Sequence, residues 1–187
     1  MKAFMFVVAV AVLALMNTAS AQVVAGDATL VVLDLSSAGL TVTTGGEVDL
    51  APVPGNTYHI FWDASNAAEV IDPPDPSLGS NADIFWDVVN AGGGGINVEF
   101  TFSLPNAFTG ADTGAQIPIT YGNADAVYED GGTNVYAWNP HMTSPPINIV
   151  AGGEGFVHLG MTFTVPFTSP TDTYSATFYL AATATGF

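Results

Sequence analysis

The sequence predicts an all-β fold: one domain in which two antiparallel sheets form a β-sandwich of about ten strands, immunoglobulin-like or jelly-roll-like. Three observations support this prediction. Helix signals are almost absent, strand patterns with a period of two residues recur, and clusters of Gly, Pro and Asn separate them. The first 21 residues differ from this pattern, so we expect the domain to span residues 22–187.

Residues 1–21 have the three-part organisation of a secretory signal peptide. Lys2 provides the positive charge, Ala3 to Met16 are apolar, and Ala19-Ser20-Ala21 is a small-x-small cleavage site. The apolar run is shorter than the ~20 residues that span a bilayer. We therefore expect cleavage before Gln22, secretion to the cell surface or the extracellular space, and no membrane insertion.

Three segments show the strand pattern most clearly. In Ile96 to Leu104, apolar residues alternate with polar ones until Pro105. Residues 157–165 and 174–183 alternate in the same way. Pro118 lies in a weaker candidate and cannot donate to a ladder, so we expect its strand at a sheet edge or a bulge. The shorter candidates are residues 28–34, 39–43, 47–50, 57–62, 83–89, 116–121, 134–138 and 146–150.

The charge of the chain excludes several functions. It has 17 Asp and Glu residues, one Lys or Arg (Lys2) and a formal net charge of −16. After cleavage no Lys or Arg would remain, and we expect no nucleic-acid partner, because proteins bind phosphate backbones with cationic side chains. A P-loop and arginine clamps are excluded for the same reason. The fold must then rest on apolar burial and ladder hydrogen bonds rather than on Lys or Arg salt bridges.

A four-residue motif, Ile-Phe-Trp-Asp, occurs twice, beginning at Ile60 and at Ile84. Strand alternation places Ile and Trp on one face and Phe and Asp on the other, so both faces carry an aromatic ring. Three hypotheses fit: core packing of the Trp rings, a subunit contact through an outward Phe, or a glycan platform. The residues that would contact a glycan or another subunit are Phe61, Trp62, Asp63, Phe85, Trp86 and Asp87.

Acidic residues gather around a Gly-Gly turn, where oxygen ligands could bind Ca²⁺. The alternative is a solvated acidic turn, because the spacing matches neither an EF-hand nor a glycine-rich repeat. We expect no other cofactor. The candidate ligands are Asp125, Glu129, Asp130 and Asn134.

Signals for catalysis are weak. His59, His141 and His158 lack the spacing of a zinc site, and we expect His158 to be exposed on the polar face of its strand. The chain has no Cys and no Gly-x-Ser-x-Gly motif, so no nucleophile is indicated. We therefore expect no enzymatic activity.

Two segments carry a family resemblance: Asn97 to Pro105, and Thr173 to Ala181 around Tyr174. Together with the signal peptide and the Thr-, Gly- and Asn-rich strands, they resemble secreted bacterial β-sandwich domains of the fimbrial-subunit and adhesin type. The resemblance implies a non-enzymatic surface or filament subunit that self-associates into a homopolymer. The alternative is a secreted module that binds a glycan or Ca²⁺.

Strand addition is one route to self-association, because a strand can pair with an open sheet edge of a neighbour. The segment from Val23 to Leu33 is apolar enough to be donated in this way. The other interpretation is that it forms the first strand of its own sheet. The candidate contact residues are Val23, Val24, Leu30 and Val32.

Overall fold

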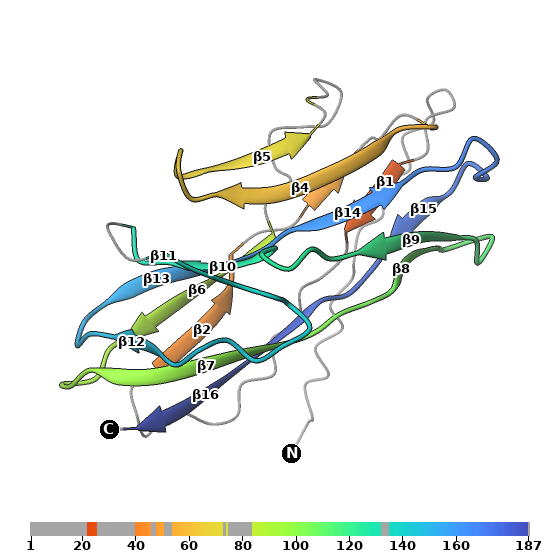
Figure 1. The fold of residues 1–187 in the computed structure, drawn as a ribbon. Helices are drawn as coiled ribbons and strands as arrows, with labels where there is room; N and C mark the ends of the chain where they lie inside the picture. The colour runs from red at the N-terminus through yellow and green to blue at the C-terminus, as the bar shows by residue number, and fades with distance from the viewer. Residues whose placement is uncertain are drawn as a thin grey trace, which may run out of the picture.

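A computed structural model of the chain describes residues 22–25, 40–45, 48–50, 54–72, 74, 84–131 and 135–186. The proposed signal peptide, residues 1–21, lies outside these ranges. Within them the structure has sixteen strands and no helix (Figure 1). Accordingly, none of the described segments is a helix that could cross a membrane.

The strands are short and separated by turns. They are β1 (Gln22–Ala25), β2 (Leu40–Thr44), β3 (Val48–Leu50), β4 (Thr57–Asp63), β5 (Ala68–Asp72), β6 (Ile84–Asn90), β7 (Ile96–Ser103), β8 (Ala107–Gly110), β9 (Gln116–Thr120), β10 (Ala126–Glu129), β11 (Val135–Trp138), β12 (Ile147–Ile149), β13 (Glu154–Leu159), β14 (Met161–Thr164), β15 (Thr173–Ser175) and β16 (Tyr179–Gly186).

These strands form three hydrogen-bonded sheets. The largest has the order β3-β1-β15-β8-β9-β14-β4-β5, the second β11-β10-β13-β6-β2 and the third β12-β7-β16. The pairing is antiparallel except between β1 and β15, which run parallel. The prediction of an all-β fold with antiparallel sheets is confirmed. The predicted number of about ten strands was too low, partly because strands such as β8 and β10 are too short to show alternation.

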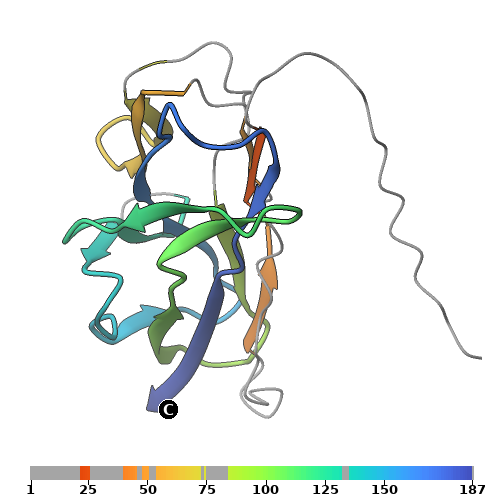
Figure 2. The same cartoon turned by 90° about the vertical axis from the view of Figure 1, so that its right-hand side faces the viewer.

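Several runs of chain pass from one sheet into another. β13 belongs to the five-stranded sheet and β14 to the eight-stranded sheet; β15 and β16 pass from the eight-stranded to the three-stranded sheet. Figure 2 shows β16 running from the region of the eight-stranded sheet down to the C-terminus. The predicted strands 157–165 and 174–183 are therefore each divided in two, because the chain changes its pairing partners part-way.

Aromatic rings fill the space between the five-stranded and three-stranded sheets. Trp86 of β6 packs on Phe102 of β7 at a centroid distance of 5.6 Å, and Phe100 stacks on Tyr128 of β10 at 6.1 Å. Trp138 of β11 stacks on Phe102 at 6.1 Å. Burial raises the pKa of the Tyr128 hydroxyl to about 12. These contacts join residues of both sheets in one apolar core.

Gly160 allows β4 to cross close to the β13–β14 strand. β14 pairs Met161 with Ile60 of β4, whereas β13 pairs Leu159 with Ile84 of β6. Between these two pairs, a Cβ atom on Gly160 would lie 2.6 Å from the carbonyl oxygen of Ile60. Only glycine fits this approach without moving the backbone of β4.

The expectation that the strand containing Pro118 lies at an edge was wrong. β9 lies between β8 and β14 in the eight-stranded sheet. Its ladder with β14 contains only Ile119 and Thr120, so Pro118 lies beyond the end of that ladder and the missing N–H is tolerated.

The buried carboxylate of Asp172 ties the start of β15 to the turn after β8. It accepts hydrogen bonds from the backbone N–H groups of Thr113 (2.8 Å), Asp112 (3.2 Å) and Thr173 (2.7 Å), and from the Thr113 hydroxyl (2.5 Å). The Thr113 hydroxyl and these backbone donors hold the pKa of Asp172 below its usual value of 3.8, against the opposing effect of burial.

Replacing Gly160 by alanine should lower the free energy of unfolding by about 1–3 kcal/mol, because the new Cβ displaces the backbone of β4. Denaturant unfolding measures this effect. Gly93→Ala is the matched control, because a Cβ atom at Gly93 meets nothing within 4 Å. Equal stability of the two variants would contradict the crossing.

Asp172→Asn should lower stability at neutral pH and reduce its dependence on acid pH. The folded-state pKa of Asp172 lies below 3.8, so the ionised carboxylate stabilises the fold above that pH. This contribution is lost as the pH falls below about 3.8 and through the folded-state pKa. Urea unfolding at pH 7 and at pH 3 measures both effects.

The control for this experiment is Asp112→Asn, because Asp112 lies in the same turn but its side chain is exposed. A difference between wild type and Asp172→Asn that is as large at pH 3 as at pH 7 would contradict the role of the ionised carboxylate.

Candidate functional site

The two copies of the Ile-Phe-Trp-Asp motif lie in different environments. Both begin with a buried isoleucine, Ile60 in β4 and Ile84 in β6. Trp86 is 0% exposed and belongs to the core, as the packing hypothesis predicts for that copy. Trp62 is only half-buried. The same four residues therefore serve one core position and one position near the surface.

Trp62 reaches the outer face of the five-stranded sheet because β4 leaves β14 at Gly160. Its indole ring stacks on the imidazole of His158, with a centroid distance of 4.0 Å and an interplanar angle of 10°. His158 is 4% exposed as a result. The expectation that His158 is exposed was wrong, because a side chain from another sheet covers the polar face of its strand.

We call Trp62, Phe85, Phe156 and His158 the outer aromatic cluster. Phe85 and His158 are opposite each other in the β6–β13 ladder, and their rings lie 5.9 Å apart. The ring of Phe156 meets that of Phe85 edge-on at 6.0 Å. Glu129 of β10 lies beside this cluster, with its Oε1 3.7 Å from His158 Nε2. The cluster thus combines stacked rings with a carboxylate.

A second histidine–carboxylate pair joins β4 to the turn before β10. His59 Nε2 is 3.2 Å from Asp125 Oδ1, and the two residues are 66 positions apart. The other carboxylate oxygen of Asp125 accepts the backbone N–H of Gly122 at 2.6 Å. The backbone carbonyl of Asp125 accepts the N–H of Gly160 at 2.6 Å. Asp125 therefore holds the turn before β10 against β4 and the Gly160 crossing.

The proposed calcium ligands are not gathered at one point. Asp125 precedes β10 and Glu129 ends it, which separates their backbones by about 13 Å. Both oxygens of Asp125 already have protein partners, and Glu129 accepts the backbone N–H of Gly131. Asp130 follows Glu129, and Asn134 lies outside the described residues. In the described ranges no group of three or more His, Asp or Glu residues could hold a metal ion, and Ca²⁺ binding stays a prediction.

Asp63 stabilises the turn between β4 and β5. Its carboxylate accepts the backbone N–H of Ser65 at 2.8 Å and the side-chain amide of Asn66 at 2.6 Å. These two hydrogen bonds, the first being the larger cause, hold the pKa of Asp63 below its usual value. The carboxylate of Asp63 thus already has a structural role at the end of β4.

The remaining predicted contact residues are Phe61 and Asp87. Phe61 stacks on His59 of the same strand at a centroid distance of 4.5 Å. Asp87 is half-buried and lies opposite Phe156 in the β6–β13 ladder. Sequence reasoning did not find the histidine pairs, because strands distant in the chain create both contacts.

The structure places part of the proposed donated strand in a sheet of its own chain. Val23 and Val24 belong to β1, which pairs with β15 on one side and with β3 on the other. Leu30 and Val32 lie outside the described residues.

Comparisons with protein families, with curated proteins and with solved structures find no match to this chain. The resemblance to fimbrial subunits and adhesins therefore remains a prediction.

The different burial of the tryptophans has a spectroscopic consequence. Trp86 and Trp138 are 0% and 7% exposed, whereas Trp62 is half-buried at the outer face. In acrylamide quenching, Trp62→Phe should remove most of the quenchable fluorescence. Trp86→Phe is the control and should retain the quenchable fluorescence. The reverse result would contradict the placement of the two copies of the motif.

Proposed function

We propose that the protein is a secreted, non-enzymatic structural subunit with a two-sheet β-sandwich fold, and that it self-associates at the cell surface or in a filament. The proposed contact is the outer edge of β11, where a strand of a second copy adds to the five-stranded sheet. The stacked core between the five-stranded and three-stranded sheets supports the sandwich.

The exposed apolar edge of β11 carries this proposal. Among the described strands, β11 pairs only with β10 and ends its sheet. Val135 is 41% exposed and Tyr136 is 36% exposed. Natural edge strands are usually protected by charged residues, prolines or bulges. An edge that presents Val and Tyr instead favours pairing with another strand.

The charge of the chain determines how such an association would depend on salt. Copies that lack the signal peptide would carry 17 acidic residues and no Lys or Arg, so they repel each other, and the repulsion is screened over about 8 Å at physiological ionic strength. An interface between copies would gain its stability from apolar contacts and ladder hydrogen bonds. Association should therefore strengthen as ionic strength rises.

The outer aromatic cluster favours a glycan-binding module as the second candidate function. Trp62 is half-buried beside Asp63, and Asp87 and Glu129 lie on the same face as Phe85. Rings next to carboxylates are the groups that contact the faces and hydroxyls of sugars. Binding to a glycan array that is lost in Trp62→Ala would favour this function, and a melting temperature raised by Ca²⁺ would favour the calcium-binding variant of it.

Tyr136→Glu should weaken self-association by roughly tenfold, because it places a charge at the proposed interface and removes an aromatic contact. Sedimentation velocity over a range of concentrations at low and high NaCl measures the effect. Met142→Glu is the matched control, because it makes the same change of charge at an exposed residue outside β11.

A strictly monomeric wild-type chain under all these conditions would overturn the proposed function. Equal weakening by the two Glu variants would show that general repulsion acts rather than the edge of β11. Association that weakens with salt would contradict the apolar interface.

A further inference from the structure

We infer that copies of this chain join head to tail, with the ring of Phe167 of one copy packed into an apolar hollow between β7 and β16 of the next. The inference rests on the proposed function, because it assumes self-association, and it adds a second contact that is separate from the edge of β11. Three observations on the described residues support it: an exposed ring held in place, a hollow of sufficient size, and the absence of charge at both.

Phe167 lies in the connection between β14 and β15 and is 84% exposed. Among the described residues it is the most exposed of the large hydrophobic side chains. Single exposed apolar residues are common on protein surfaces, so exposure alone does not indicate a contact. The way in which the backbone holds this ring is the stronger observation.

The tip of the Phe167 ring rests on the backbone of Gly55. A Cβ atom on Gly55 would lie 2.1 Å from Cζ of Phe167, and the φ of Gly55 is 91°, in the left-handed region. The N–H of Gly55 donates to the carbonyl of Val165 at 2.6 Å, and the N–H of Ser169 donates to that of Pro166 at 3.0 Å. The ring is therefore positioned by its own turn while most of its surface stays open. A side chain that is already ordered loses less conformational entropy on binding.

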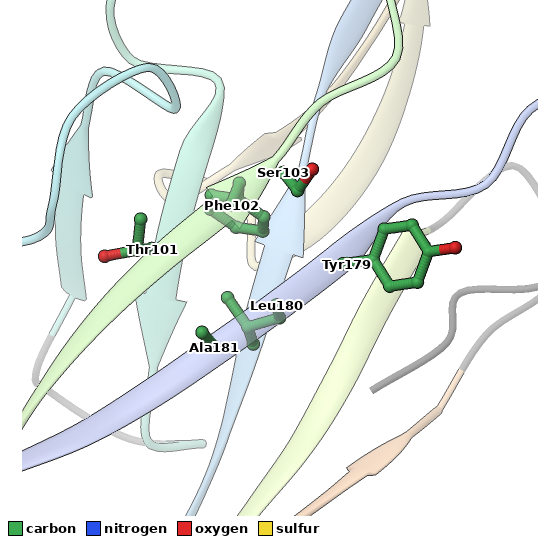
Figure 3. A pocket seen from close by; sticks show the side chains of 6 residues that line it. All are labelled: Thr101, Phe102, Ser103, Tyr179, Leu180 and Ala181. Carbon is green, nitrogen blue, oxygen red and sulfur yellow. The ribbon is translucent and has the colours of Figure 1, made fainter. Parts of the chain in front are cut away.

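The hollow lies where β7 ends and β16 begins. It has a volume of about 340 Å³. A cavity of about 150 Å³ is enough for a benzene molecule, so one phenyl ring fits here. Figure 3 shows Tyr179 pointing away from β7, and this side chain is 37% exposed, so its ring is available for an aromatic contact with an incoming ring. The lining residues are Thr101, Phe102, Ser103, Tyr179, Leu180 and Ala181.

The ring and the hollow lie on different parts of the molecule. Figure 1 shows the connection between β14 and β15 at the upper right, whereas β16 runs to the lower left. A contact between two different surfaces of identical chains is heterologous, so it repeats from copy to copy and produces a ring or a filament. This geometry supports the filament form of the proposed function.

Both surfaces are free of charged residues. Residues 164–171, which include Phe167, contain no Asp or Glu, and none of the six lining residues is charged. The chain as a whole has 17 acidic residues, and like charges brought together across an interface repel each other. Two uncharged apolar surfaces are therefore places where acidic copies can approach with little repulsion. A second copy suits this hollow better than a cationic ligand, because no carboxylate lines it.

Two variants of the whole chain test the contact, one from each side. Phe167→Ser removes the ring, and Ala181→Trp fills the hollow with a side chain of the same molecule. Each should weaken self-association by roughly tenfold, because each removes one half of the contact. Sedimentation velocity over a range of concentrations at high NaCl measures the effect.

Val150→Ser and Thr185→Trp are the matched controls. Val150 is 63% exposed and follows β12, away from both surfaces. Thr185 is exposed and lies in the same strand as Ala181, about 13 Å further along. Both controls should associate like the wild type. Weakening by the controls that equals the weakening by the test variants would overturn the inference.

A mixture of the two test variants shows whether the contact is head to tail. Both chains also carry Tyr136→Glu, which removes the contribution of the β11 edge. In the mixture, the Ala181→Trp chain supplies the ring and the Phe167→Ser chain supplies the hollow, so one contact per pair is restored. We expect one-to-one dimers in the mixture and weaker association of either chain alone. A mixture that associates no better than its components would overturn the inference.

The same measurements separate this contact from the proposed contact at β11. Weakening by Tyr136→Glu but not by Phe167→Ser would overturn the inference and leave the β11 contact supported. Weakening by Phe167→Ser but not by Tyr136→Glu would support the inference and overturn the β11 contact. A strictly monomeric wild-type chain would overturn both.

Discussion

The close crossing at Gly160 is the constraint on which the rest of the structure depends. Because residue 160 has no side chain, β4 can leave β14 there and β6 can take its place beside β13. One continuous strand then serves two sheets. The same crossing sends Trp62 over His158 and brings the carbonyl of Asp125 to the N–H of Gly160. The place of Trp62 in the outer aromatic cluster thus depends on the close backbone approach at Gly160.

In the described part of the chain, carboxylates are stabilised without Lys or Arg partners. Asp172 accepts the Thr113 hydroxyl and backbone N–H groups, and Asp63 accepts the backbone N–H of Ser65; these hydrogen bonds lower the pKa of both carboxylates. Asp125 accepts the N–H of Gly122 and faces His59. Backbone amides thus form the hydrogen bonds to carboxylates that cationic side chains form in ordinary domains. The turns and the packed rings therefore hold the sheets together.

Sheet edges decide where this fold can make contact with other molecules. Within the described residues, each of the three sheets has two edge strands: β3 and β5, β11 and β2, and β12 and β16. Among these edges, that of β11 presents the exposed side chains of Val135 and Tyr136, which favours it as the place for strand addition.

The sequence by itself determined the fold class and the strongest strands, because period-two alternation, as in Ile96 to Leu104, is a local property of the chain. It also allowed for a core role of Trp86. It could not distinguish Trp86 from Trp62, because both lie in the same Ile-Phe-Trp-Asp motif and have the same local pattern. It also could not indicate that His158 is buried, because the ring that covers it comes from a distant strand. Only the tertiary structure decided these environments, since they depend on which distant strand lies beside each residue and on the space left by one missing Cβ atom at Gly160.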